Sequence, residues 1–140
     1  MAAFVKVKTG SKFEDIASYS RAVAIDDLIF VSNTAGRNPE TNEIPDDIAE
    51  QLHQVFANIK KALNAIDSSL QEIVSYRIYV PNAENIEKIA PILGEYFKNI
   101  DPTSTLICSP LAAPYYKVEM EVIAHRKASQ LQATYINTKS

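Results

Sequence analysis

Residues 101–124, DPTSTLICSPLAAPYYKVEMEVIA, place hydroxyl side chains shortly before a carboxylate in an apolar run. Glu119 is that carboxylate, within the alternating stretch VEMEVIA. In a cleft it would act as an acid or as a base that orients water. Outside a cleft it would be a strand carboxylate paired with backbone amides or with a neighbouring subunit. The segment therefore predicts two pieces of a binding cleft that needs a cation nearby.

The other polar groups of this segment belong to Ser104, Thr105 and Cys108. The two hydroxyls can donate hydrogen bonds to a ligand oxygen, although a lone hydroxyl in a strand is usually structural. The thiol has no base or cation beside it in the sequence, so a partly buried, unreactive side chain is expected. We count all three as candidate ligand-binding residues.

Three arginines are candidates for the cation, namely Arg21, Arg37 and Arg77. Arg37 is the first choice because it follows a strand on a loop rich in Asn, Gly and Pro, where binding residues often lie. Arg21 and Arg77 fall within predicted strands, where a solvated or interface role is expected. Solvation is also the common state of a loop arginine.

A sheet and a long helix are predicted to position these residues. Residues 22–32 predict a hairpin of two strands, and residues 33–47 predict a surface loop. Apolar residues at three- and four-residue steps predict a helix that is capped by Asp47 and ends before Asp67. Further strands are expected over 72–80, 105–108 and 117–125.

A second helix is predicted from Ile86 to Phe97, with Pro91 inside it. An interior proline costs ~3 kcal/mol, so a kink or a late start near Pro91 is expected. Each helix carries one apolar stripe, which places both on the same face of a mixed sheet. The glutamates of the last strand then lie on the other face, and self-association is the simplest way to cover it.

Length and charge restrict the class of protein. The 140 residues fit one domain, assigned to residues 1–128, followed by a loosely held tail over 129–140. The chain has 17 acidic and 14 basic side chains and a net charge of −3, so no nucleic-acid partner is expected. A single cysteine and the lack of a long apolar run predict a cytoplasmic protein that does not bind membranes.

From about Tyr19 to Ala124 the chain resembles the YjgF/RidA family. The order and spacing of five segments carry the resemblance: YSRAV, IFVSNTAGRNPETNE, AEQLHQVFANIKKAL, SSLQEIVSYRIYV and VEMEVIA. It implies an α+β, chorismate-mutase-like fold, with a mixed six-stranded sheet, two helices on one face, and a homotrimer that forms a central barrel. It also implies clefts at the subunit interfaces that hydrolyse enamines or imines such as 2-aminoacrylate, with no cofactor or metal.

The family pattern also assigns roles to single residues. Tyr19 matches the cleft tyrosine and Glu119 the cleft glutamate, so these two are the predicted catalytic residues. Ser32 matches the strand serine of the cleft, and Asn33 stands where the family has glycine. Ser104 stands where active members carry an arginine that grips the substrate carboxylate. The chain therefore resembles a branch of the family that lacks this arginine.

Two functions from different classes stay open. The first is a homotrimer whose interface clefts bind a carboxylate- or carbonyl-bearing metabolite and hydrolyse an enamine or imine. The second is a trimer that binds a metabolite or regulates without catalysis, because Ser104 captures a carboxylate less well than an arginine. A ribonuclease or translation inhibitor, another label that the family carries, is disfavoured by the acidic balance of the chain.

Overall fold

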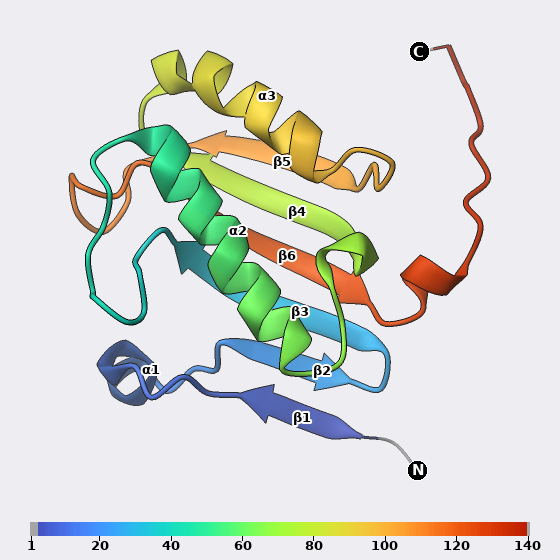
Figure 1. The fold of residues 1–140 in the computed structure, drawn as a ribbon, viewed down its shortest axis with the longest axis horizontal. Coiled ribbons are helices and arrows are strands. Elements are labelled where there is room, and N and C mark those ends of the chain that lie inside the picture. The colour runs from blue at the N-terminus through green and yellow to red at the C-terminus, as the bar shows by residue number, and fades with distance from the viewer. Residues whose placement is uncertain (1–2, 140) are drawn as a thin grey trace.

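The computed structural model describes residues 3–139, which form a six-stranded mixed sheet with two long helices on one face (Figure 1). The strand order is β1-β2-β3-β6-β4-β5, and only β4 and β5 pair in parallel. The predicted fold class, α+β with a mixed six-stranded sheet and two helices on one face, is confirmed. The strands are β1 (Phe4–Val7), β2 (Ala22–Ile25), β3 (Leu28–Ala35), β4 (Ile73–Val80), β5 (Thr103–Cys108) and β6 (Glu119–His125).

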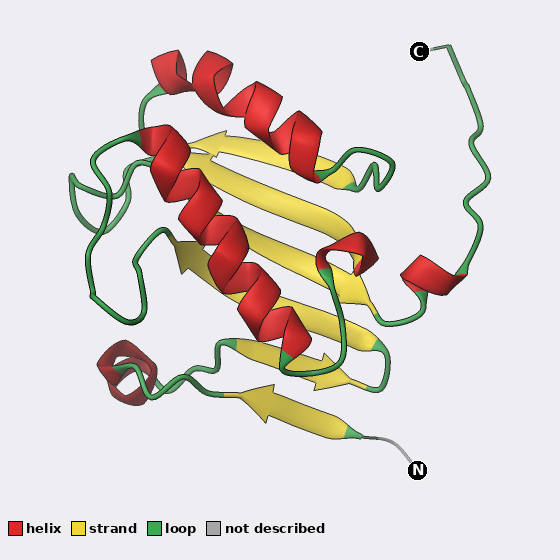
Figure 2. Cartoon of the chain, in the orientation of Figure 1, coloured by secondary structure: helices red, strands yellow, loops and turns green. Residues whose placement is uncertain are grey.

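Helical segments and longer loops connect the strands (Figure 2). The α-helices are α1 (Lys12–Ala17), α2 (Ile48–Asn64) and α3 (Ile86–Tyr96), and the 3-10 turns are η1 (Leu70–Glu72), η2 (Ala83–Asn85) and η3 (Ala128–Gln130). No helix within residues 3–139 is long and apolar enough to cross a membrane.

Helix α2 begins where the sequence predicts. The side chain of Asp47 accepts a hydrogen bond from the backbone amide of Glu50 at 3.1 Å, which satisfies one of the free amides of the first turn. The helix ends at Asn64, and the chain then turns through Asp67 with a positive φ of 59°. Its buried stripe consists of Ile48, Gln51, Leu52, Val55, Phe56, Ile59, Ala62 and Leu63.

Helix α3 runs through Pro91, so the expected late start is wrong. The proline ring removes the hydrogen bond to the carbonyl four residues earlier, at Glu87. Both residues are exposed, so water can satisfy that carbonyl. Ile89 and Leu93 are buried on the opposite side of the helix and keep it on the sheet. Burial of this stripe outweighs the local cost of the proline.

Strand β3 extends three residues further than predicted, so the loop expected over 33–47 is wrong for its first three positions. Thr34 pairs with Met120 of β6 and is 1% exposed. The register shifts between Val31 and Thr34, which marks a β-bulge. This part of the strand has no apolar alternation in the sequence, because Asn33 is polar and exposed whereas Thr34 is polar and buried.

Helix α1 has no counterpart in the sequence prediction. It is six residues long and contributes one buried carboxylate, Glu14. Burial opposes ionisation of Glu14, but hydrogen bonds from the hydroxyl and amide of Thr9, with the charges of Arg21 and Lys8, lower its pKa overall. The ionised carboxylate therefore ties α1 to the chain that precedes it.

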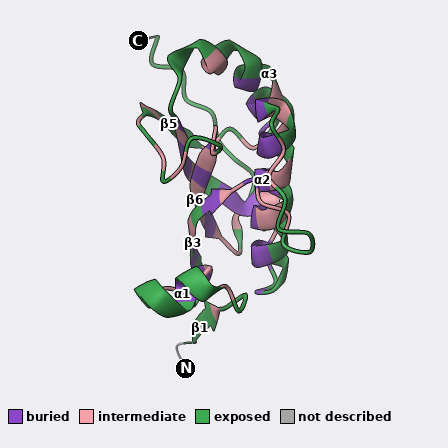
Figure 3. Cartoon of the chain, turned by 90° about the vertical axis from the view of Figure 1, so that its left-hand side faces the viewer, coloured by how far each residue is buried: buried purple, intermediate pink, exposed green. Residues whose placement is uncertain are grey.

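The hydrophobic core lies between the two long helices and the sheet (Figure 3). The opposite face of the sheet, called the open face here, is not covered by a helix. Its apolar end includes Phe4, Leu28 and Phe30, which are 65%, 40% and 42% exposed. Cross-strand pairing places Ile25 against both Phe4 and Leu28. A contiguous apolar surface of this kind is rare on a monomer unless a partner covers it.

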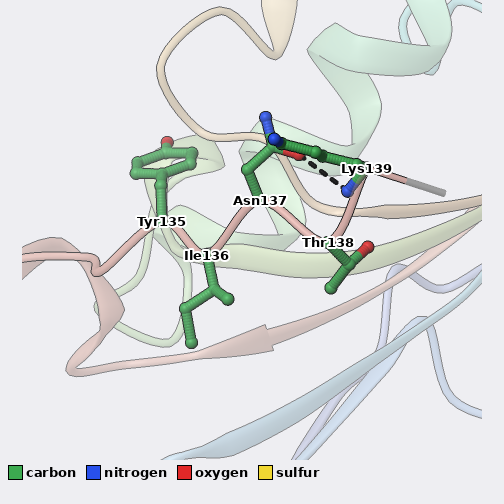
Figure 4. Close-up of a pocket in the computed structure, with 5 residues that line it drawn as sticks. All are labelled: Tyr135, Ile136, Asn137, Thr138 and Lys139. Carbon is green, nitrogen blue, oxygen red and sulfur yellow. Dashed lines mark hydrogen bonds between the residues drawn. The ribbon is translucent and has the colours of Figure 1, made fainter.

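The C-terminal tail is exposed from residue 131 to residue 139. The hydroxyl of Tyr135 donates a hydrogen bond to the carboxylate of Asp101 at 2.7 Å. Five tail residues line a shallow hollow at its end (Figure 4). Because every lining residue belongs to this one segment, the hollow is not a cleft between elements. The predicted division between residues 1–128 and a loosely held tail stays a prediction.

The close contact between Gly36, just after β3, and helix α2 predicts a stability change. A Cβ atom added at Gly36 would lie 2.4 Å from the backbone oxygen of Gln51 in α2, so Gly36→Ala should destabilise the fold by about 1–3 kcal/mol. Urea unfolding measures this. At Gly94 in α3 an added Cβ meets nothing within 4 Å, so Gly94→Ala is the matched control, expected to stabilise by up to about 1 kcal/mol. Equal stability of the two variants would contradict the predicted contact.

Candidate functional site

Glu119 begins β6 and lies on the open face of the sheet. Its neighbour Met120 is fully buried under the helices, so the alternation of the strand directs Glu119 to the other side. Its Oε1 atom accepts a hydrogen bond from the side-chain amide of Asn33 at 2.8 Å. Burial raises the pKa of Glu119, while the charge of Arg21 acts against that increase. The result is a half-buried carboxyl group that holds its proton more tightly than an exposed one.

The β-bulge in β3 brings Asn33 to this carboxylate. Val31 and Thr34 pair with β6 residues that are two positions apart, so Ser32 and Asn33 together oppose the single residue Glu121. The Ser32 hydroxyl then donates to a backbone carbonyl, that of Ser20, at 2.7 Å. Asn33 is exposed and turns to Glu119. A regular strand would not let both side chains reach their partners.

Arg21 and Tyr19 are linked to Glu119 through Asn33, since Arg21 contacts Asn33 and Tyr19 contacts Arg21. Nη1 of Arg21 donates to the hydroxyl of Thr34 at 3.2 Å and to the backbone oxygen of Asn33 at 3.5 Å. The guanidinium carbon lies 5.8 Å from the ring centre of Tyr19, close enough for a cation-π contact. We call Tyr19, Arg21, Asn33 and Glu119 the Glu119 cluster. It contains a carboxyl, an amide, a phenol and a cation.

Arg37 lies outside the Glu119 cluster. Its Nη1 donates to the backbone oxygen of Asn42 at 2.8 Å, and its Nη2 donates to the hydroxyl of Tyr116 at 2.9 Å. The side-chain amide of Asn58 in α2 holds its backbone oxygen at 2.8 Å. These contacts fasten the loop that follows β3 to α2 and to the segment before β6. The guanidinium is thus occupied by protein groups.

Ser104 and Cys108 lie on β5, an edge strand that is separated from β6 by β4. Both pair with buried residues of β4, so their side chains face the helix side of the sheet, opposite to Glu119. Thr105 alternates with them and shares the open face with Arg77. In a single chain Ser104 and Glu119 therefore do not share a cleft. The predicted cleft between them stays a prediction for an assembly of several copies.

Cys108 is exposed, so the expected partly buried thiol is wrong. The cause is the position of β5 at the edge of the sheet, where only β4 flanks it. Ser104 and Thr105 are exposed for the same reason. The hydroxyls thus remain accessible to a ligand or to a second copy of the chain.

Arg21, and not Arg37, is the arginine near Glu119. A strand arginine is usually solvated, and that expectation placed Arg37 ahead of it. A signal was present, because Tyr19 and Arg21 are two residues apart and so point to the same side of an extended chain. Within residues 3–139 no group of three His, Cys, Asp or Glu side chains could hold a metal ion. The Glu119 cluster is suited instead to binding a small anion and moving a proton.

The matched family and relatives agree with this fold. A protein-family model described as Endoribonuclease L-PSP matches residues 9–126. A RutC family protein of Pyrococcus abyssi is 31% identical over 113 residues, covering 80% of this chain and 89% of that protein. The chain belongs to the YjgF/RidA family. The resemblance drawn from the sequence is confirmed.

Two further comparisons bear on structure and function. The crystal structure of a Mycobacterium tuberculosis member of the YjgF/YER057c/UK114 family has a TM-score of 0.80 and 31% identity, covering 88% of this chain and 99% of that one. A protein of Dermatophagoides farinae described as 2-iminobutanoate/2-iminopropanoate deaminase is 25% identical over 111 residues, covering 79% of this chain and 87% of that protein. The YjgF/RidA fold thus extends over nearly the whole chain.

The raised pKa of Glu119 predicts a pH-dependent effect of Glu119→Gln. A carboxyl whose pKa is higher in the folded state than in the unfolded state weakens folding as pH rises through that range. Glu119→Gln has no carboxyl to ionise, so its folding is not weakened as pH rises. Its free energy of unfolding should equal that of the native protein near pH 4 and exceed it at pH 7. Thermal unfolding at both pH values measures the difference, with exposed Glu95→Gln as the control. A variant that is less stable at pH 7 would show that the ionised form is favoured.

Proposed function

We propose that the chain forms a homotrimer through the open face of its sheet. Support comes from the apolar end of that face, where large side chains such as Leu28 and Phe30 stay about two-fifths exposed in one chain. Burial of apolar surface contributes roughly 25 cal/mol per Å², which is the main driving force for association. Edge strand β5 is the second surface available for contact, because its outer side pairs with no other strand among the described residues.

The ligand site of this assembly lies between subunits. The Glu119 cluster of one subunit supplies the carboxyl and the cation, and β5 of the next supplies Ser104, Thr105 and Cys108. This arrangement would join Glu119 to Ser104 and Cys108, which one chain keeps on the opposite face of its sheet. Closing the cleft would also remove water from Glu119 and strengthen its interactions.

The proposed reaction is hydrolysis of a small imine or enamine that carries a carboxylate. In its protonated form, the Glu119 carboxyl donates its proton to the imine nitrogen as the oxygen of a water molecule bonds to the imine carbon. The carboxylate then takes the extra proton from that oxygen and passes it to the nitrogen of the carbinolamine. The C–N bond breaks with release of ammonia, and the hydroxyl proton returns to Glu119, which leaves the 2-oxo acid and the starting carboxyl. An enamine follows the same path once a proton has moved from nitrogen to carbon.

The observation that carries this proposal is the Glu119 carboxyl itself. It is half-buried, has a raised pKa, and is oriented by the amide of Asn33 at 2.8 Å. A carboxyl whose pKa is raised by burial is better suited to both proton transfers than an exposed one. The deaminase of Dermatophagoides farinae shares the fold family and supports the choice of substrate class. The free thiol of Cys108 fits a reducing compartment, so we place the protein in the cytoplasm.

The first test concerns assembly. Light scattering should give three times the 15.5 kDa mass of the chain. Phe30→Glu should lower this mass to that of a single chain, because burying the new charge at the interface would disfavour association. Phe13→Glu is the matched control, because Phe13 is similarly exposed but lies on α1, away from the sheet. A native mass of one chain would contradict both the trimer and the cleft between subunits.

The second test concerns chemistry. Native protein should remove 2-aminoacrylate, generated by a dehydratase, faster than buffer does, and Glu119→Gln should return the rate to that of buffer because it cannot transfer a proton. Glu95→Gln on α3 should keep the native rate. A native trimer that leaves 2-aminoacrylate at the buffer rate would instead identify the non-catalytic, metabolite-binding alternative.

A further inference from the structure

Arg21 has hydrogen-bonding capacity that the chain does not use. The hydrogen bonds of its guanidinium start from Nη1, and both go to uncharged oxygens, on Thr34 and Asn33. Its Nε atom is buried and has no hydrogen-bond partner among residues 3–139. Buried donors are almost always paired, so an unpaired one in a native fold calls for an explanation.

The charge of Arg21 is also not neutralised by direct contact. It acts on the pKa of both Glu14 and Glu119, so the two carboxylates are near it. Within the described residues, however, the ion pairs closer than 4.0 Å are those of Arg126 and Lys127 with Asp27. Glu14 is already bonded to Thr9. A guanidinium held close to carboxylates without pairing to them can accept an additional anion.

Asn33 links Arg21 to the reacting carboxyl. Its backbone oxygen accepts from Arg21, and its side-chain amide donates to Glu119. Arg21 precedes β2 and Glu119 begins β6, so β3 alone separates the two strands, a span of roughly 10 Å between backbones. Both side chains contact Asn33 in the bulge of β3. A compact acid could touch both groups at once.

The other arginines considered are less suited to this role. Arg37 uses both terminal nitrogens on Asn42 and Tyr116. Arg77 is exposed on β4, opposite Glu121, outside the Glu119 cluster. Arg21 is the half-buried arginine of the three whose guanidinium keeps unused donors.

We propose that Arg21 binds the carboxylate of the ligand, in place of the arginine that the family pattern expects at position 104. This inference rests on the proposed function, and it limits the ligands to small 2-oxo and 2-imino acids. In such an acid one bond separates the carboxylate from the reacting carbon. Arg21 can then hold the carboxylate while Glu119 serves the adjacent carbon and nitrogen.

Binding of 2-oxobutanoate, a product-like acid, tests the inference by calorimetry. Its neutral counterpart 2-oxobutanamide lacks the carboxylate, so native protein should prefer the acid. Arg21→Gln should weaken binding of the acid by about ten-fold to a hundred-fold, the usual loss for a hydrogen bond to a charged group, and should leave the amide unaffected. Arg77→Gln removes a cation from the same face of the sheet and should bind both compounds as native protein does.

Arg21→Lys provides a second binding test of Arg21 if Arg21→Gln does not fold. It keeps the charge but loses the planar fork, so binding of the acid should fall to an intermediate level. Unchanged affinity of either folded variant for 2-oxobutanoate would overturn the role of Arg21 and leave the proposed hydrolysis intact. Native protein that binds the acid through Arg21 but does not consume 2-aminoacrylate would keep this inference and overturn the hydrolysis. Native protein that does neither would overturn both.

Discussion

The one-sided cover of the sheet is the constraint on which the rest of the structure depends. Two helices cover one face of the sheet, and strands β2, β3, β4 and β6 supply the buried side chains of a single core on that face. The other face must then be stable in water or be covered by another molecule. Its residues are divided accordingly, with large apolar side chains toward the start of β3 and polar side chains toward its end. The open face of the sheet therefore serves both association and ligand binding in the proposed assembly.

At the polar end, the bulge in β3 decides which groups meet. An extra residue in β3 lets Ser32 bond to the backbone while Asn33 turns to Glu119. Asn33 replaces the glycine of the family pattern, and its amide uses the space above the strand to orient the carboxyl. The departure at position 33 thus links two charged groups, because Asn33 contacts Glu119 through its side chain and Arg21 through its backbone oxygen.

Residues of edge strand β5 have different surroundings in a single chain and in an assembly of several copies. Ser104 and Cys108 are distant from Glu119 within the chain because β4 intervenes and because they face the helix side. Both residues are exposed at the edge of the sheet, so they are available to a neighbouring copy of the chain. Whether they act as ligand-binding residues is a property of the assembly, since no arrangement of one sheet can bring residues of opposite faces together.

Periodicity and capping in the sequence were sufficient for much of the fold. The stripe of α2, its Asp47 cap and the alternation of β4 and β6 follow from local spacing, because burial repeats every 3.6 residues in a helix and every two in a strand. The family resemblance also selected Glu119 and Tyr19 as candidate catalytic residues, and their roles stay a prediction. The energetic cost of an interior proline predicted a kink or a late start near Pro91. The helix instead runs through Pro91, because burial of Ile89 and Leu93 holds it on the sheet.

Only the tertiary structure decided which groups surround Glu119. Arg21 and Asn33 are 98 and 86 positions away from it in the chain, and they reach it through the pairing of β2, β3 and β6 and through one bulge. A register shift of a single residue redirects side chains between the faces of a sheet, and neither composition nor spacing records it. The sequence by itself determined which residue types were available, whereas strand pairing determined that Arg21, and not Arg37, stands beside the carboxyl.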